Sequence, residues 1–158
     1  MKQFRSHSAE DTRELGRKIG AVLKGNDLIC LIGDLGTGKT ALTGGMAEGL
    51  GIKGYITSPT FTIVNEYNAY IPLYHFDVYR LSDPDEMFEI GFEEYLYGNG
   101  VVVIEWADMI KDILPRDYIR IEIKKDIENG VDERIITIEF SGEKYEGYES
   151  QLTINNEE

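Results

Sequence analysis

The pattern of apolar and polar positions along the chain predicts strands and helices that alternate. Two uninterrupted apolar runs, residues 28–32 and 101–104, are typical of buried parallel strands. Residues 8–23 carry apolar side chains at helical spacing, with Ser8 placed to cap the helix and acids in its first turn. A second helix is expected over residues 41–50. Residues 118–123 and 133–140 alternate in polarity and predict strands at a sheet edge.

The middle of the chain predicts smaller elements. A short strand is expected at residues 55–57, and two strands at 61–67 and 70–76 would form an antiparallel hairpin. A proline among acids at residues 82–86 indicates a helix start, with helical pieces to about residue 90 and over 92–97. We expect residues 1–142 to form a single domain and residues 143–158 to be a flexible, polar and acidic tail.

The loop after the first buried strand carries the strongest chemical signal. It has the spacing G-x-x-x-x-G-K-T of the phosphate-binding P-loop, between an expected strand and an expected helix. Its glycines permit a tight turn whose N–H groups face phosphates. Lys39 would reach the β- and γ-phosphates, and the Thr40 hydroxyl would coordinate Mg²⁺. The expected nucleotide-binding residues are Gly33, Asp34, Leu35, Gly36, Thr37, Gly38, Lys39, Thr40 and Ala41.

This motif makes the predicted fold a three-layer α/β domain of the P-loop NTPase type, with a mixed parallel and antiparallel sheet. Such a site needs a carboxylate near Mg²⁺ and a group that orients the attacking water. Asp77 and Glu105 each follow an apolar strand, where side chains face a ligand bound at the strand ends. A turn acid and an exposed strand-end acid are the alternatives. Thr60 could sense the γ-phosphate, or could belong to an ordinary turn before a strand.

Composition and charge limit the classes of partner. The net charge is −13, with seven basic and six acidic residues in 1–50 but nine and twenty-three in 51–158. A protein that binds nucleic acid without a partner normally has a cluster of basic residues, which this sequence lacks. The single cysteine, Cys30, excludes an intramolecular disulfide. No apolar stretch is long enough to span a membrane and no signal sequence is present, so a cytoplasmic location is expected.

Four motifs in this order and spacing resemble the TsaE family, also called YjeE or YdiB: G-D-L-G-T-G-K-T at 33–40, S-P-T-F-T at 58–62, H-F-D-V-Y-R-L at 75–81 and I-E-W-A at 104–107. The resemblance implies a weak bacterial ATPase that supports formation of threonylcarbamoyladenosine on tRNA. It implies two protein partners: TsaD, which transfers the threonylcarbamoyl group, and TsaB, its scaffold. Contact with tRNA would be only indirect. ATP or ADP and Mg²⁺ would be its cofactors.

The resemblance also implies roles for individual residues. Lys39 and Thr40 would bind phosphate and Mg²⁺, and Asp77 and Glu105 would serve Mg²⁺ and hydrolysis. The segment around Thr60 would act as a switch loop, and Trp106 would lie beside the site.

Other readings of the P-loop stay open on the residues alone. A small P-loop kinase would need a lid with several arginines, whereas Arg80 is the only basic residue between positions 79 and 97. A GTPase would need N-K-x-D to read guanine, and the chain has no such motif. A nucleotide-dependent assembly module, whose turnover is incidental, would share every feature of the site.

Overall fold

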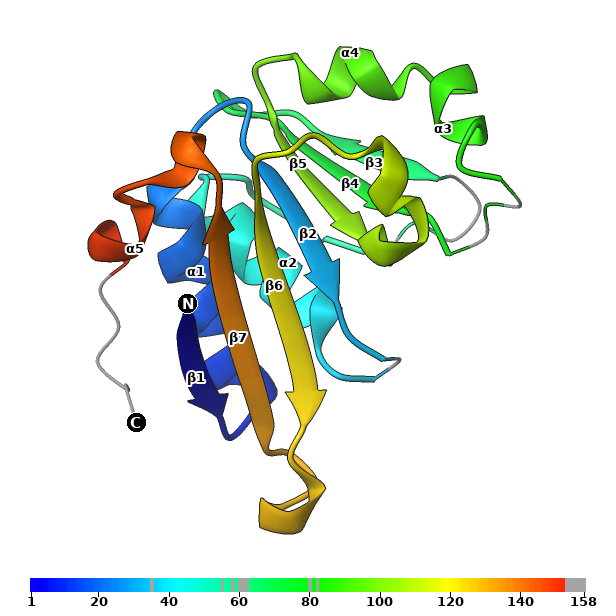
Figure 1. Cartoon of the computed structure of the whole chain (residues 1–158). Helices are drawn as coiled ribbons and strands as arrows, with labels where there is room; N and C mark the ends of the chain where they lie inside the picture. Colours follow the sequence, from blue (N-terminus) through cyan, green and yellow to red (C-terminus); the bar gives the residue numbers. More distant parts are fainter. Residues whose placement is uncertain are drawn as a thin grey trace.

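The computed structural model describes residues 1–34, 36–54, 56–57, 59, 63–79, 81 and 83–152. Within these residues seven strands form one mixed sheet in the order β1-β7-β6-β2-β5-β4-β3 (Figure 1). The strands are β1 (Lys2–Ser6), β2 (Leu28–Ile32), β3 (Val64–Tyr67), β4 (Leu73–Asp77), β5 (Val101–Glu105), β6 (Tyr118–Lys125) and β7 (Arg134–Ser141). β4, β5, β2 and β6 run parallel, whereas β3, β7 and β1 pair antiparallel at the two ends of the sheet.

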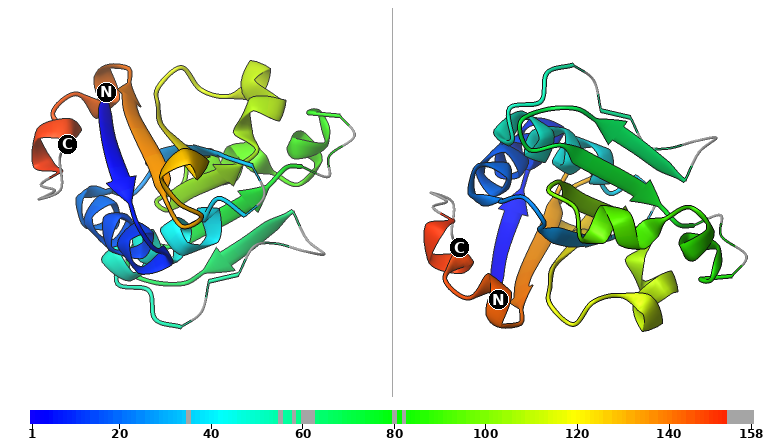
Figure 2. Two further views of the ribbon diagram at one scale, coloured as in Figure 1. Left: turned by 90° about the horizontal axis from the view of Figure 1, so that it is seen from below. Right: turned by 90° about the horizontal axis from the view of Figure 1, so that it is seen from above.

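Helices cover both faces of this sheet. α1 (Ala9–Val22) and α2 (Lys39–Gly49) lie together on one face, and α3 (Glu86–Glu89), α4 (Phe92–Leu96) and the 3₁₀ helix η1 (Ala107–Ile113) lie on the other (Figure 2). Each layer has its own apolar cluster, one on either side of the sheet. The predicted three-layer α/β fold with a mixed sheet is therefore confirmed.

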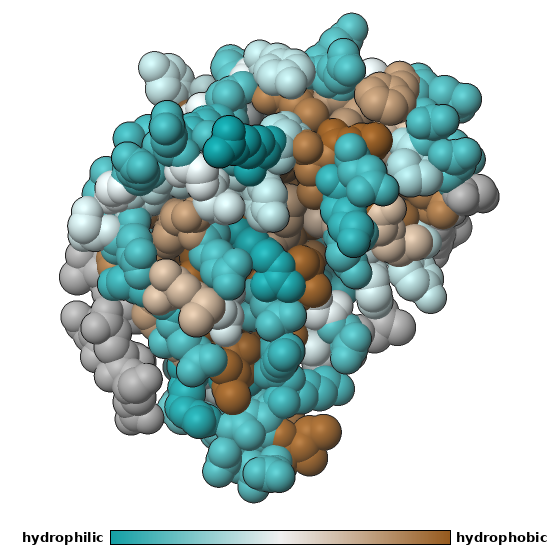
Figure 3. Space-filling model, in the orientation of Figure 1, coloured by the Kyte–Doolittle hydropathy of each residue, from teal (hydrophilic) through white to brown (hydrophobic). Residues whose placement is uncertain are grey.

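The strand patterns explain their places in the sheet. β5 is buried at every position, and β2 at every position but its last, because layers cover both of their faces. β6 and β7 alternate between buried and more exposed positions, so only one of their faces lies against the core. The other face is open to solvent and is mostly hydrophilic (Figure 3).

Glycines set the distance between α1 and α2. A Cβ added at Gly16 would lie 2.4 Å from the Leu42 carbonyl oxygen, and one at Gly45 would lie 2.1 Å from the Arg13 carbonyl oxygen. Since side-chain atoms cannot approach backbone so closely, the two helices pack backbone against backbone at these points. The position of α2, which follows the P-loop, is thereby fixed against α1.

Several local predictions hold with shifted ends. Ser8 caps α1 by accepting a hydrogen bond from the Asp11 N–H at 3.0 Å. α2 begins two residues earlier than predicted, and β3 and β4 form the expected antiparallel hairpin with a longer connection. Residues 56 and 57 belong to no strand, which contradicts the short strand predicted there. β1 was not predicted, because five residues at the chain terminus have no distinct periodicity and are held by pairing with β7.

The prediction of a flexible tail from residue 143 is wrong for residues 143–152. This segment forms the 3₁₀ helix η3 (Glu143–Tyr145) and α5 (Tyr148–Gln151), and buries Tyr145, Tyr148 and Leu152 in the core. The Tyr145 hydroxyl accepts a hydrogen bond from the Leu28 N–H at 2.8 Å. Apolar side chains at spacings of three and four residues outweigh the acidic composition that suggested disorder. Residues 153–158 lie outside the described residues.

Candidate functional site

The loop between β2 and α2 has the backbone of an anion-binding turn. Gly36 and Gly38 adopt φ angles of +78° and +110°, a left-handed conformation that side chains other than glycine's disfavour. Gly38 precedes the first residue of α2 and brings no side chain to cap the helix. The first N–H groups of α2 and the positive end of its dipole are therefore directed into the loop, the arrangement that favours an anion.

Side chains from inside and outside the loop hold this conformation. The Thr37 hydroxyl, which is buried, donates to the Asp34 carbonyl oxygen at 2.8 Å. Arg134, at the start of β7, donates from Nε to the Thr37 carbonyl oxygen at 2.9 Å and from Nη2 to the Gly36 carbonyl oxygen at 3.3 Å. These two hydrogen bonds tie the backbone of the loop to the start of β7.

Lys39 occupies a nearly closed position at the start of α2. Only 7% of the residue is exposed, and its Nζ donates to the Gly33 carbonyl oxygen at 2.6 Å. The same ammonium lies 3.9 Å from Oε1 of Glu105 and 4.1 Å from the centre of the Trp106 ring. The backbone of Trp106 is left-handed, at φ 62°, which is uncommon for an aromatic residue and characteristic of functional sites. The Lys39 ammonium group can exchange its contacts with the Gly33 carbonyl and the Trp106 ring for a contact with a phosphate.

Two carboxylates end neighbouring strands next to this lysine. Asp77 on β4 and Glu105 on β5 are partners in the parallel register, so both side chains rise from the same face of the sheet. Asp77 is half-buried and accepts a hydrogen bond from the Tyr79 N–H at 3.0 Å. Glu105 is 3% exposed, and its Oε2 lies 2.5 Å from Nε2 of the fully buried His75. Thr40 lies exposed in the first turn of α2.

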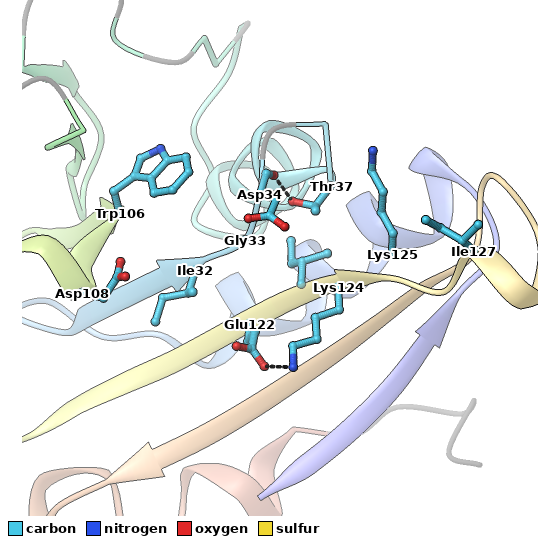
Figure 4. Close-up of a pocket in the computed structure, with 11 residues that line it drawn as sticks. Ile32, Gly33, Asp34, Thr37, Trp106, Asp108, Glu122, Lys124, Lys125 and Ile127 are labelled. Atoms are coloured by element: carbon cyan, nitrogen blue, oxygen red, sulfur yellow. Dashed lines mark hydrogen bonds and ion pairs between the residues drawn. The ribbon is translucent and has the colours of Figure 1, made fainter.

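A cavity of about 440 Å³ lies beside the loop (Figure 4). Its lining comes from three parts of the chain: the end of β2 with the loop, the segment after β5, and the end of β6 with the turn beyond it. The lining residues are Ile32, Gly33, Asp34, Thr37, Trp106, Asp108, Glu122, Ile123, Lys124, Lys125 and Ile127. This volume lies in the range usual for small-molecule sites. Two lysines and three acids line the cavity, and Lys124 lies 3.5 Å from one of these acids, Glu122.

Cys30, in the strand that leads into the loop, takes no part in this chemistry. The residue is 2% exposed, and burial raises the pKa of its thiol to about 12. A thiol with so high a pKa is not a nucleophile at neutral pH. The cysteine therefore acts as a small apolar side chain.

Comparisons with known proteins find relatives that match most of the chain. The sequence model of the family described as "Threonylcarbamoyl adenosine biosynthesis protein TsaE" matches residues 6–136. The chain belongs to the TsaE family. It is 46% identical over 149 residues to the tRNA threonylcarbamoyladenosine biosynthesis protein TsaE of Bacillus subtilis, covering 92% of this chain and 91% of that protein. It is 43% identical over 119 residues to the protein of the same name from Treponema pallidum, covering 75% and 88%.

Among solved structures, the crystal structure of YdiB from Bacillus subtilis superposes with a TM-score of 0.78 at 41% identity. The match covers 95% of this chain and 92% of that one. The fold of the TsaE family, with its P-loop, is thus shared over nearly the whole chain. P-loop folds of this kind are typical of nucleotide-binding proteins.

The structure brings most of the residues selected from the sequence into one place. Residues 33–34 and 36–40 surround the turn, with Ala41 in the first turn of α2, and Lys39, Glu105 and Trp106 are in contact. Leu35 and Thr60, the proposed switch residue, lie outside the described residues.

Sequence reasoning missed two residues at this site. Arg134 lies 97 positions from Thr37 in the chain, and no local pattern marks it as a partner of the loop. His75 could have been found, because it precedes Asp77 by two residues on a strand and so shares its face of the sheet.

Proposed function

We propose that this member of the TsaE family binds ATP with Mg²⁺ and hydrolyses it slowly. Its ATPase cycle would support turnover of a TsaB–TsaD complex in tRNA threonylcarbamoyladenosine formation. The observation that carries this proposal is the position of Lys39 at the start of α2, between the P-loop backbone and the paired acids Asp77 and Glu105. The cation, the helix N-terminus and the acids together form a phosphate and Mg²⁺ site.

The residues present fit the magnesium ion. Two acids directly opposite each other on neighbouring strands repel, and a divalent cation between them would relieve that repulsion. Asp77, Glu105 and the hydroxyl of Thr40 offer the oxygen ligands that Mg²⁺ prefers. When bound, the ion would neutralise negative charge on the phosphates.

The protein's own groups would perform the remaining tasks. The N–H groups of Gly33 to Ala41 would hold the phosphates, and Lys39 would leave the Gly33 carbonyl and the Trp106 ring to stabilise charge on the transferred phosphate. Glu105 would orient the attacking water, and Asp77 would assist as the second acid. Thr60 would sense the γ-phosphate from the switch segment.

The proposed setting of this activity follows from charge and partners. Among the described residues no helix is long and apolar enough to cross a membrane. The excess of acidic residues beyond position 50 opposes direct binding of tRNA, so contact with tRNA would run through TsaB and TsaD. We place this cycle in the cytoplasm.

ATP turnover, measured with and without TsaB and TsaD, tests the proposal. Lys39→Ala should abolish turnover while the fold survives, whereas Lys53→Ala removes the same charge from an exposed position beyond α2 and should not. Asp77→Ala and Glu105→Ala should each impair Mg²⁺-dependent hydrolysis more than nucleotide binding. Normal turnover by folded Lys39→Ala would refute the assignment. A wild-type chain that leaves ATP intact, even with both partners, would refute the function.

A further inference from the structure

His75 is a buried polar residue that makes one polar contact with the described residues. None of the residue is exposed, and its Nε2 donates a hydrogen bond to Oε2 of Glu105 at 2.5 Å. The described part of the chain offers its Nδ1 no hydrogen-bond partner. A buried polar group is costly unless its hydrogen bonds are satisfied, and a histidine used only for packing could be replaced by an apolar residue. The contact with Glu105 is therefore the distinctive feature of this side chain.

The sheet register makes this contact possible. His75 lies opposite Val103, and Glu105 follows Val103 by two residues, so both side chains rise from the face that α2 covers. One oxygen of Glu105 is occupied by His75, while the other, Oε1, lies 3.9 Å from Nζ of Lys39. The histidine thereby determines which carboxylate oxygen faces the P-loop lysine.

We propose that His75 is a positioning residue, which fixes the rotamer of Glu105 and keeps it from closing onto Lys39. This inference rests on the proposed ATPase function. Removing the Nε2 donor would take away the contact that holds Oε2, and the carboxylate would then be drawn toward the ammonium group to form a closer ion pair. Such a pair would compete with the phosphate for Lys39 and would misplace the acid that orients the water.

Steady-state kinetics separate this role from a packing role. His75→Leu removes the donor, and His75→Gln retains an N–H donor near the same place. Phe76→Leu is the matched control, because Phe76 is equally buried on the same strand but packs in the cluster on the opposite face. We expect kcat of His75→Leu to fall by about 10- to 100-fold, the usual effect of losing a partner that orients a ligating group. KM should rise by a smaller factor than kcat falls, because the P-loop N–H groups still bind the phosphates, and His75→Gln should recover most of kcat.

The kinetic outcomes are decisive in either direction. Equal kcat losses in His75→Leu, His75→Gln and Phe76→Leu would mean that His75 acts through packing alone and would overturn the inference. Normal turnover of His75→Leu would do the same while leaving the ATPase function intact. Absence of turnover in the wild-type chain with its partners would instead remove the proposed function, and this role with it.

Nitrogen NMR provides a readout that does not depend on turnover. The chain has two histidines, and His7 is mostly exposed, so ¹⁵N-imidazole labelling yields two distinguishable rings. The Nε2–H proton of His75 should resonate far downfield and exchange slowly, because the ring is buried and donates to a carboxylate. Glu105→Gln should shift this signal strongly and leave that of His7 in place. An unchanged His75 signal would show that the contact is absent and would overturn the inference.

Discussion

Replacing Gly45 with alanine would test how closely the P-loop helix packs against α1. The added Cβ would lie 2.1 Å from the Arg13 carbonyl oxygen and 2.9 Å from the Gly16 Cα. Both are backbone atoms, which cannot rotate away as the end of a side chain can. The two helices would therefore have to separate by more than about 1 Å before the contact reached an ordinary van der Waals distance.

The expected cost follows from two opposing contributions. Overpacking a close contact costs about 1–3 kcal/mol, and a clash between backbones lies at the upper end of that range. Alanine favours the helix over glycine by up to about 1 kcal/mol, which offsets part of this cost. Gly45→Ala should thus lower the free energy of unfolding by about 2 kcal/mol, or the melting temperature by about 4–8 °C for a chain of this size.

Gly44→Ala supplies the control on the same helix. Its Cβ would meet the Arg13 guanidinium at 3.4 Å, which is the movable end of a side chain. This variant should therefore unfold at the same urea concentration as the wild type, or be more stable by up to about 1 kcal/mol. Urea unfolding of the three proteins, with equal m-values, measures the difference. Equal stability of the Gly44→Ala and Gly45→Ala variants would refute the close helix contact.

Two further predictions concern the site, and a third concerns the buried thiol of Cys30. Arg134→Lys should raise the Kd for MgADP by about tenfold in calorimetry, because a lysine cannot make both hydrogen bonds to the loop carbonyls; an unchanged Kd would exclude this bracing role. MgADP should change Trp106 emission saturably, since Lys39 leaves the ring to reach phosphate, and flat emission despite calorimetric binding would contradict it. Cys30 should resist labelling by a disulfide reagent in the native protein at pH 8, where a pKa of about 12 leaves roughly one thiolate in ten thousand, and should react once unfolded.

Elements with strong local patterns were predictable, and elements held by distant contacts were not. The buried strands β2 and β5 and the capped helix α1 follow from apolar runs and helical spacing. β1 depends on pairing with β7, and the segment of residues 143–152 depends on burying Tyr145 and Tyr148 against the core. Burial of a few aromatic side chains can stabilise a segment whose composition suggests disorder. The average composition of a segment does not show which of its side chains will be buried.

The sequence by itself determined the phosphate-binding loop and the chemical types of the residues around it. A tight turn before a helix requires glycines at fixed spacing, and strand ends place Asp77 and Glu105 at the same edge of the sheet. Only the tertiary structure decided that Arg134 braces the loop and that His75 holds Glu105. These contacts depend on strand order and register, which are set by packing of the whole sheet and not by neighbouring residues in the chain.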